Sequence, residues 1–88
     1  MLEVVYMSQP LSLESRIITE DKEERIDFKE NTFKIEFSGY ILFPLDTPID
    51  IMRHKDSDQI GTAIINSLTF ENHKTICTYQ LISLYSVN

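Results

Sequence analysis

The sequence predicts a single all-β domain, folded as a small antiparallel β-barrel or pseudobarrel of five to seven short strands. The first observation is a two-residue alternation of apolar and polar side chains in Phe33–Ser38 and Leu11–Glu14. Successive side chains of a strand point to opposite faces, so this period indicates one buried and one solvated face. The second is that no amphipathic helical pattern separates the turn signals. Because closure removes exposed edges, a barrel is favoured over an open sheet.

The first part of the chain is expected to hold one strand and one charged loop. The chain is predicted to be one domain that spans residues 1–88, in which residues 1–9 form either a short strand or an N-terminal arm. A strand from Leu11 to Thr19 follows. Residues 20–25 are all charged and have no apolar neighbours at helical spacing, so they are predicted to be a solvated loop. The apolar face of the Leu11–Thr19 strand would hold Leu11, Leu13 and Ile17.

The middle of the chain carries the clearest alternation. Residues 26–28 begin a strand, and residues 29–31 turn it into the strand Phe33–Ser38. Gly39 is expected to mark a bend or bulge, where the absence of a Cβ permits strained backbone. Tyr40–Phe43 is apolar on both faces, so it is predicted to be a central strand covered on both sides or part of a barrel wall.

A proline-framed connector, Phe43–Pro48, leads into the second half. Each proline fixes its own φ and favours extended backbone in the residue before it. Ile49–Arg53 then resumes the strand alternation. Residues 55–59 are expected to form a turn, because Asp and Ser side chains form hydrogen bonds to the nearby backbone.

The last two strands are predicted to form a hairpin. Ile60–Phe70 is followed by residues 71–74, which have the length of a hairpin loop. Thr75–Tyr85 is the longest β-favouring segment. Its apolar phase slips between Tyr79-x-Leu81 and Ile82-x-Leu84, as a β-bulge would require.

The overall charge does not favour nucleic acid as a partner. The chain has 88 residues, a net charge of −6 and eight Lys and Arg residues scattered along it. A phosphate backbone would be repelled unless these cations gathered on one face. The chain opens without a signal-peptide pattern, has a single cysteine and has no apolar run long enough to cross a membrane. A cytoplasmic protein without membrane contact is therefore expected.

No cofactor, metal site or catalytic set is predicted. His54, His73 and Cys77 are the only soft metal ligands, which is too few for a closed zinc site. Asp56-x-Asp58 resembles the start of a calcium loop, but Ile60 occupies a ligand position, so a turn is favoured. Cys77 lies mid-strand and is expected to be a buried, unreactive thiol.

Two segments are candidates for binding a protein partner. The first is the connector, where a rigid corner could display an aromatic anchor, unless Phe43 and Leu45 turn inward. The second is the C-terminal strand, which is apolar on both faces and is therefore either sealed in the barrel or a homodimer contact. The candidate residues are Tyr40, Phe43, Leu45, Asp46, Leu84 and Tyr85.

Five segments carry a resemblance to a known family: Lys22–Ile26, Gly39–Tyr40, Phe43–Ile49, Gly61–Ile65 and Thr78–Leu84. In these segments the chain resembles a family of small uncharacterised proteins, with a domain of unknown function, from Bacillus-type Gram-positive bacteria. The resemblance implies a cytosolic bacterial protein and no particular functional residue. A weaker resemblance, in the strand around Gly61–Ile65, is to pseudobarrels of the PUA and ASCH kind, which implies binding of RNA or a nucleotide.

The sequence thus favours a non-enzymatic binding or accessory domain with a protein partner. The first alternative is a PUA-like or ASCH-like pseudobarrel that binds RNA or a nucleotide. The second is a small hydrolase that uses loop carboxylates, for which Asp46 and Asp50 would be the pair.

Overall fold

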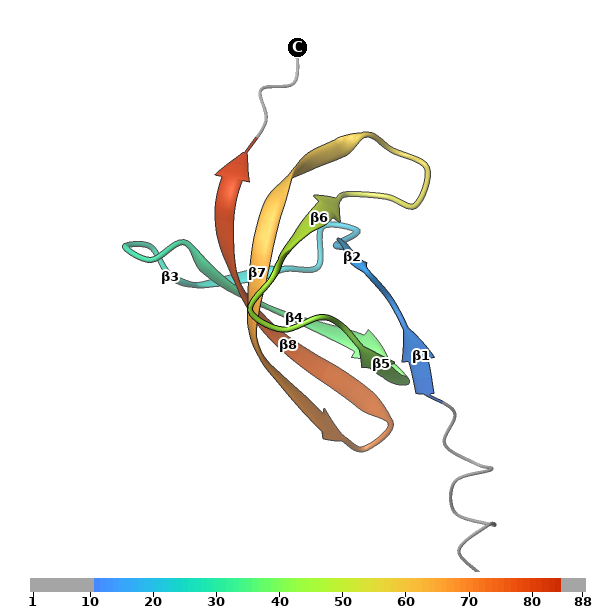
Figure 1. Cartoon of the computed structure of the whole chain (residues 1–88). Coiled ribbons are helices and arrows are strands. Elements are labelled where there is room, and N and C mark those ends of the chain that lie inside the picture. The colour runs from blue at the N-terminus through green and yellow to red at the C-terminus, as the bar shows by residue number, and fades with distance from the viewer. Residues whose placement is uncertain (1–10, 85–88) are drawn as a thin grey trace, which may run out of the picture.

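The computed structural model describes residues 11–84, which form eight strands and no helix (Figure 1). Consequently, no helix of this part of the chain is long and apolar enough to cross a membrane. The prediction of an all-β, barrel-like fold is confirmed, and the arm predicted for residues 1–9 lies outside the described residues. The strands are β1 (Leu11–Leu13), β2 (Arg16–Ile18), β3 (Glu24–Asp27), β4 (Thr32–Ser38), β5 (Tyr40–Leu42), β6 (Pro48–Met52), β7 (Gln59–Glu71) and β8 (Lys74–Leu84).

The main sheet has six strands in the order β2-β6-β7-β8-β4-β3, and β1 pairs with β5 in a separate two-stranded sheet. Figure 1 shows the main sheet curling around the long β7–β8 pair into a half-barrel. Right-handed twist and bulges bend a sheet in this way. The two ends of the strand order, β2 and β4–β3, do not pair with each other, so the barrel is open along one side.

The β7–β8 hairpin forms as the sequence predicts. Its turn residues Asn72 and His73 both have positive φ, 51° and 64°, which is the conformation of the turn that suits two-residue hairpins. The register skips Ile82 between the pairs Thr62–Ser83 and Ala63–Leu81, so the predicted phase slip is a bulge. A second bulge, at Asn66, bends β7 further along.

The strand predicted from Leu11 to Thr19 is instead broken at residues 14–15. β1 and β2 pair in parallel with β5 and β6 respectively, so the expected all-antiparallel pairing is also corrected. Only Ile17 of the predicted apolar face is buried, whereas Leu11 and Leu13 are exposed. The total of eight strands within residues 11–84 exceeds the five to seven predicted, because three-residue strands are too short to show a period of their own.

Tyr40–Phe43 is not a central strand. β5 pairs only with β1, and Leu42 on it is exposed. Phe43 alone of this segment is fully buried. Its apolar residues are divided between two faces of a small sheet rather than covered on both sides.

The C-terminal strand is not sealed inside the barrel, so the first of the two arrangements predicted for it is wrong. Leu84 is 68% exposed and Ile82 is 50% exposed. β8 pairs with β4 only from Lys74 to Gln80, so the strand runs on beyond the edge of its neighbour. Tyr85 lies outside the described residues.

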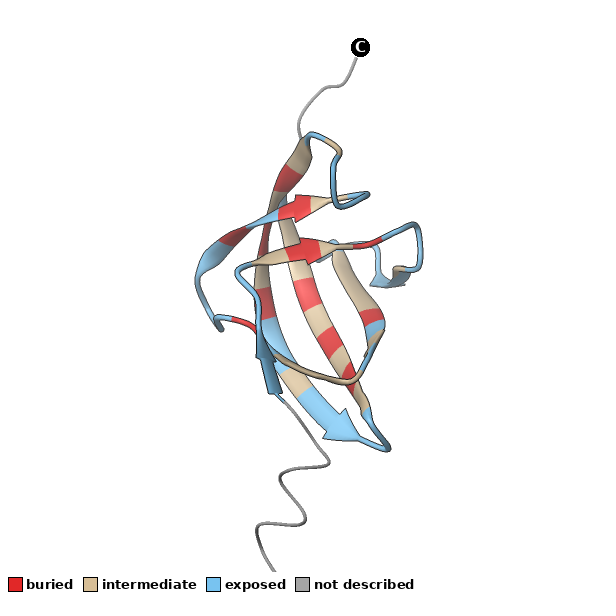
Figure 2. Cartoon of the chain, turned by 90° about the vertical axis from the view of Figure 1, so that its right-hand side faces the viewer, coloured by how far each residue is buried: buried red, intermediate tan, exposed pale blue. Residues whose placement is uncertain are grey.

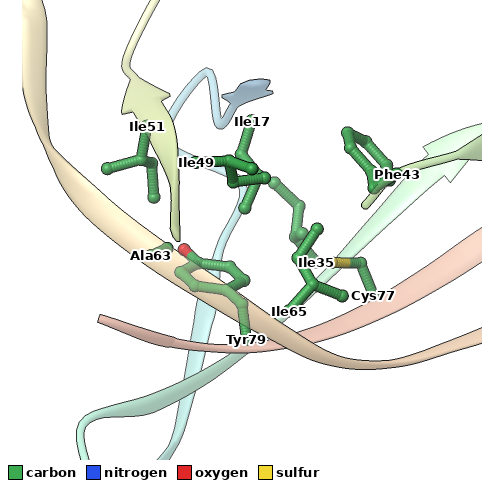
Figure 3. Close-up of a cluster of buried hydrophobic side chains, with 9 residues drawn as sticks. All are labelled: Ile17, Ile35, Phe43, Ile49, Ile51, Ala63, Ile65, Cys77 and Tyr79. Carbon is green, nitrogen blue, oxygen red and sulfur yellow. The ribbon is translucent and has the colours of Figure 1, made fainter. Parts of the chain in front are cut away.

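The core lies on the concave face of the half-barrel, where buried positions alternate along the strands (Figure 2). β6 shows the pattern most simply, because Ile49 and Ile51 are buried while Pro48 and Asp50 are exposed. Phe33 stacks on Tyr79 at 5.5 Å between ring centroids. Figure 3 shows the cluster, which consists of Ile17, Ile35, Phe43, Ile49, Ile51, Ala63, Ile65, Cys77 and Tyr79.

Cys77 and Tyr79 are ionisable groups within this core. Burial raises the pKa of the Cys77 thiol to about 12. Burial also raises the pKa of Tyr79, with smaller contributions from the Glu23 carboxylate and from Cys77. The expected buried thiol is confirmed.

Two glycines occupy positions where any other residue would introduce strain or a steric clash. Gly39 has a φ of 83°, which confirms the predicted bend, and its N–H donates to the carbonyl oxygen of His73 at 2.7 Å. At Gly61 the constraint is space, because an added Cβ would overlap the carbonyl oxygen of Ser83 and lie 3.3 Å from the Cα of Leu84.

Gly61→Ala is expected to lower the free energy of unfolding by about 2–3 kcal/mol, because the Cβ forces β7 and β8 apart. Gly39→Ala has open space around the new Cβ and should cost only about 1 kcal/mol of backbone strain. Urea titration of both variants measures the difference. Equal losses would show that β7 and β8 do not approach closely at Gly61.

The Cys77 thiol is expected to be unreactive toward Ellman's reagent at pH 8 in the native protein and to react fully in 6 M guanidinium chloride, because only the thiolate attacks. Asp56→Cys, which places a thiol at an exposed position in the loop after β6, is the positive control. Rapid reaction of native Cys77 would contradict its burial.

Stability is expected to fall as the pH rises above about 9, where the thiol of the unfolded chain ionises while the native thiol stays protonated. The raised native pKa therefore stabilises the fold fully below pH 9, and this contribution is lost between pH 9 and pH 12. Each pH unit in that window should cost about 1.4 kcal/mol through Cys77. Urea titrations at pH 8 and pH 10 should show a smaller pH effect in Cys77→Ala.

Candidate functional site

The structure separates the residues of the predicted corner. The Phe43 side chain turns into the core, where its ring lies 5.4 Å from that of Phe37. Leu45 remains 46% exposed, and Asp46 is exposed with a φ of 58°. The Asp46 N–H donates to the carbonyl oxygen of Ile65, which holds the corner against β7. The corner therefore does not display Phe43 as an aromatic anchor.

Tyr40 lies away from the corner, beside the β7–β8 turn. Its ring meets the edge of Phe70 at 5.9 Å between centroids and stacks with the His73 ring at 6.1 Å. The Tyr40 hydroxyl accepts a hydrogen bond from the backbone N–H of His73 at 3.0 Å. These contacts attach the β1–β5 sheet to the hairpin turn.

One face of the β1–β5 sheet is apolar and open to solvent. Leu11 pairs with Tyr40 and Leu13 with Leu42, so all four side chains share a face. Leu11, Leu13 and Leu42 are 56%, 73% and 42% exposed. Phe70 extends the surface through its contact with Tyr40. We call this surface the outer apolar face.

A cleft of about 420 Å³ lies on the other side of the same small sheet, along the open side of the half-barrel. Its apolar floor is Ile18, Phe37, Ile41 and Phe43. A smaller hollow continues it and shares Ile18, Phe37 and Ile41. We call this space the seam cleft. The charged residues at its rim are Glu14, Arg16, Glu20 and Lys55.

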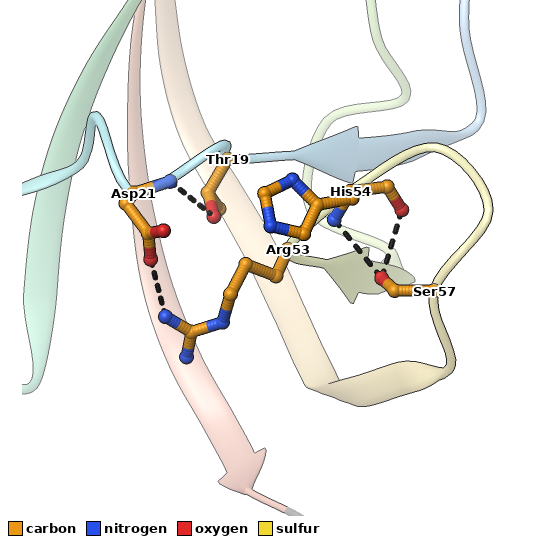
Figure 4. A network of polar contacts seen from close by, with 5 residues as sticks. All are labelled: Thr19, Asp21, Arg53, His54 and Ser57. Carbon is orange, nitrogen blue, oxygen red and sulfur yellow. Dashed lines mark hydrogen bonds and ion pairs between the residues drawn. The ribbon is translucent and has the colours of Figure 1, made fainter.

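Hydrogen bonds between two loops hold one end of the seam cleft (Figure 4). The Arg53 guanidinium pairs with the Asp21 carboxylate, and the Glu20 N–H donates to the Arg53 carbonyl oxygen at 2.7 Å. The Ser57 hydroxyl donates to the carbonyl oxygen of His54 at 2.8 Å and accepts from its N–H at 2.9 Å. These bonds fix the backbone on either side of Lys55, so the rim is defined by both loops.

Two cations of the cleft rim have no carboxylate partner. Across residues 11–84, Glu20 pairs with Lys22, but neither Arg16 nor Lys55 forms an ion pair. Arg16 Nη1 donates only to the sulfur of Met52, at 3.6 Å. Glu14 and Glu20 lie on the same rim without forming an ion pair with either cation, so Arg16 and Lys55 remain available to pair with a negative group.

The other groups considered for chemistry lie apart from the seam cleft. Within the described range, no three His, Cys, Asp or Glu side chains gather as a metal site would require. Asp46 and Asp50 do not line the cleft, and Asp50 accepts a hydrogen bond from Gln59 at 2.9 Å. His54 and the Asp56–Asp58 segment lie in the loop after β6, as the turn pattern predicted.

Sequence reasoning found neither surface as a whole, although its candidates Tyr40 and Phe43 lie in the outer apolar face and in the cleft floor respectively. The outer apolar face depends on a parallel pairing of two three-residue strands, which leaves no period in the sequence. The seam cleft combines residues from three separate segments, so no local motif marks it. The leucines of β1 gave no signal of exposure in the sequence, because their alternation with polar residues assigned them to the core.

Comparison with known proteins agrees with this fold. Residues 7–88 match the family described as "Domain of unknown function (DUF2584)". The chain is 42% identical over 82 residues to a protein of Bacillus subtilis (strain 168) described as "Uncharacterized protein YtmB". That alignment covers 93% of this chain and 100% of the relative.

A solved structure extends the agreement to three dimensions. The X-ray crystal structure of protein YtmB from Bacillus subtilis superposes with a TM-score of 0.84 at 41% sequence identity. The match covers 93% of this chain and 99% of that chain. The predicted resemblance to small uncharacterised Bacillus-type proteins is confirmed, and the chain belongs to the DUF2584 family, whose function is unknown.

Proposed function

We propose that this chain is a non-enzymatic, cytoplasmic protein-binding domain and that its outer apolar face is a docking surface. The observation that carries the proposal is the side-by-side exposure of Leu11, Leu13 and Leu42. Single exposed apolar side chains are ordinary, but adjoining ones typically mark interaction surfaces.

The marginal stability of the β1–β5 sheet supports this role. Each strand has three residues, and an isolated two-stranded sheet is at best marginally stable in water. Hydrogen bonds from Thr75 attach it to β8, since the Thr75 hydroxyl accepts from the Ile41 N–H at 2.9 Å and donates to the Gly39 carbonyl oxygen at 2.8 Å. A partner that covers the leucines would add apolar burial where the fold itself supplies little.

The chemistry of the surface favours a protein partner. Its contact atoms are leucine and aromatic carbon, and the net charge of −6 repels phosphate backbones. The single cysteine is a buried free thiol, which suits the reducing cytoplasm.

Leu13→Ser combined with Leu42→Ser is expected to weaken partner binding at least tenfold, because two exposed apolar contacts are lost. The partner is first identified by photo-cross-linking from benzoylphenylalanine at position 13 in living Bacillus subtilis cells. It is then purified, and its Kd is measured by calorimetry for the wild type and the variant.

The matched control is Leu45→Ser, which removes a comparably exposed leucine outside this face and should change the Kd less than twofold. Equal effects of the control and the double variant would contradict the docking surface. Cross-linking to RNA instead of protein would contradict the proposed function. If the captured protein is a second copy of this chain, Leu84→Glu in sedimentation experiments tells whether the dimer uses β8 instead.

A further inference from the structure

We propose that the seam cleft is a second binding site, which takes an extended peptide segment of a protein partner between the free edges of β2 and β4. The segment would complete the barrel by strand addition. The inference rests on the proposed function only in that the ligand is a protein, because it uses a different surface from the outer apolar face.

The first bank of the cleft is the free edge of β2. In a parallel pair, alternate residues direct their N–H and C=O groups toward the partner strand. The Thr19 N–H donates to the carbonyl oxygen of Met52 on β6 at 2.8 Å. The backbone N–H and C=O groups of the even-numbered residues before it therefore point away from β6. Arg16 and Ile18 are those residues, and both line the cleft. Their backbone groups face the open side of the half-barrel.

The second bank is the free edge of β4. β3 pairs with β4 only from Thr32 to Lys34, so the rest of β4 has no neighbour on that side within the described strands. The Leu81 N–H donates to the Asn31 carbonyl oxygen at 2.9 Å, and the Gly39 N–H donates to His73. Odd-numbered positions of β4 therefore face β8, and even-numbered ones face away.

The backbone groups of Glu36 and Ser38 consequently face away from β8, toward the cleft. Both residues line its continuation, together with Ile18 of the opposite bank. The two banks thus meet at one space. An edge with unpaired N–H and C=O groups is the feature that strand-adding peptides recognise.

The strand directions define how a segment would fit. β2 is parallel to β6, and each following pair β6–β7, β7–β8 and β8–β4 is antiparallel. β2 and β4 are therefore antiparallel to each other. A strand between them runs parallel to one bank and antiparallel to the other, and its successive amides point alternately to the two banks.

The cleft also defines which side chains the segment carries. An apolar side chain fits against the floor of Phe37, Ile41 and Phe43. A carboxylate on the segment pairs with Arg16 and Lys55, which form no ion pair within residues 11–84 although Glu14 and Glu20 lie on the same rim. The ligand class is therefore an extended peptide with an apolar residue close to an acidic one.

A nucleotide fits the same space less well. Stacking of a base requires an open, flat aromatic face, whereas Phe43 is buried and the half-buried ring of Phe37 is tilted against it by 41°. Free strand edges bind the regular backbone of a polypeptide, which nucleic acid lacks.

The experiment selects binders from a phage library of random linear dodecapeptides and titrates the most enriched synthetic peptide into the ¹⁵N-labelled chain. Amide shifts are expected at Arg16, Ile18, Glu36 and Ser38. The N–H groups of these residues should also exchange more slowly with solvent when the peptide is bound. AMP and poly(U) RNA are titrated in parallel and should bind at least tenfold more weakly.

N-methylation of single peptide amides tests whether the segment bridges both banks. Each methyl in the bound stretch should weaken binding about fivefold, because each amide donates to one bank or the other. Weakening at alternate amides alone would show addition to one edge and would overturn the bridging geometry. No weakening at any amide would overturn strand addition altogether.

Lys55→Glu tests the charge at the rim and should weaken peptide binding about threefold to fivefold. Lys29→Glu is the matched control, because Lys29 lies in the exposed β3–β4 turn and does not line the cleft. Equal binding of the two variants would overturn the charge pairing.

Three further outcomes would overturn the inference. The first is tighter binding of RNA or AMP than of the peptide, and the second is peptide-induced shifts confined to the outer apolar face. The third is loss of peptide binding in the double variant Leu13→Ser, Leu42→Ser. The last two would leave the proposed function standing. Loss of partner binding in the outer-face variant, with peptide binding in the cleft retained, would support two separate sites.

Discussion

The pairing of β7 with β8 is the interaction through which every other strand of the main sheet reaches its place. β6 adds to the outer edge of β7 and β4 to the outer edge of β8, and β2 and β3 then pair with those strands. The Asn72–His73 turn sets the register of the central pair. Its bulges at Ile82 and Asn66 bend that pair, so the sheet curls and gains a concave face on which a core can form.

Features that depend on residues close together in the chain could be predicted from the sequence, whereas features that depend on distant residues could not. The hairpin, the Gly39 bend, the C-terminal bulge and the buried Cys77 are all determined by neighbours in the chain, and all were predicted. The break at residues 14–15 was not, because Leu11, Leu13 and Ile17 keep the spacing of one strand while belonging to two sheets. Hydrophobic period reports which side a residue faces, but not whether anything covers that side.

The candidate surfaces were unpredictable for a related reason. Phe43 was predicted either to be an aromatic anchor or to turn inward, and the structure places it in the core and in the cleft floor. Both surfaces belong to one small sheet. On β5, Ile41 faces the seam cleft while Leu42 and Tyr40 face outward, so the same three residues shape both sites. A ligand that orders β5 from one side also orders the residues presented on the other.

The parallel pairings of β1 and β2 also determine how the chain must fold during synthesis. Both strands leave the ribosome before their partners β5 and β6 have been made. Ile17 can therefore pair with Ile51 only after β6 has been synthesised. The β7–β8 hairpin needs no distant partner, because its two strands are joined by a two-residue turn. Elements held through few contacts are the first to open. The bank of the cleft formed by β2 is thus the part of the barrel that can separate while the hairpin stays intact.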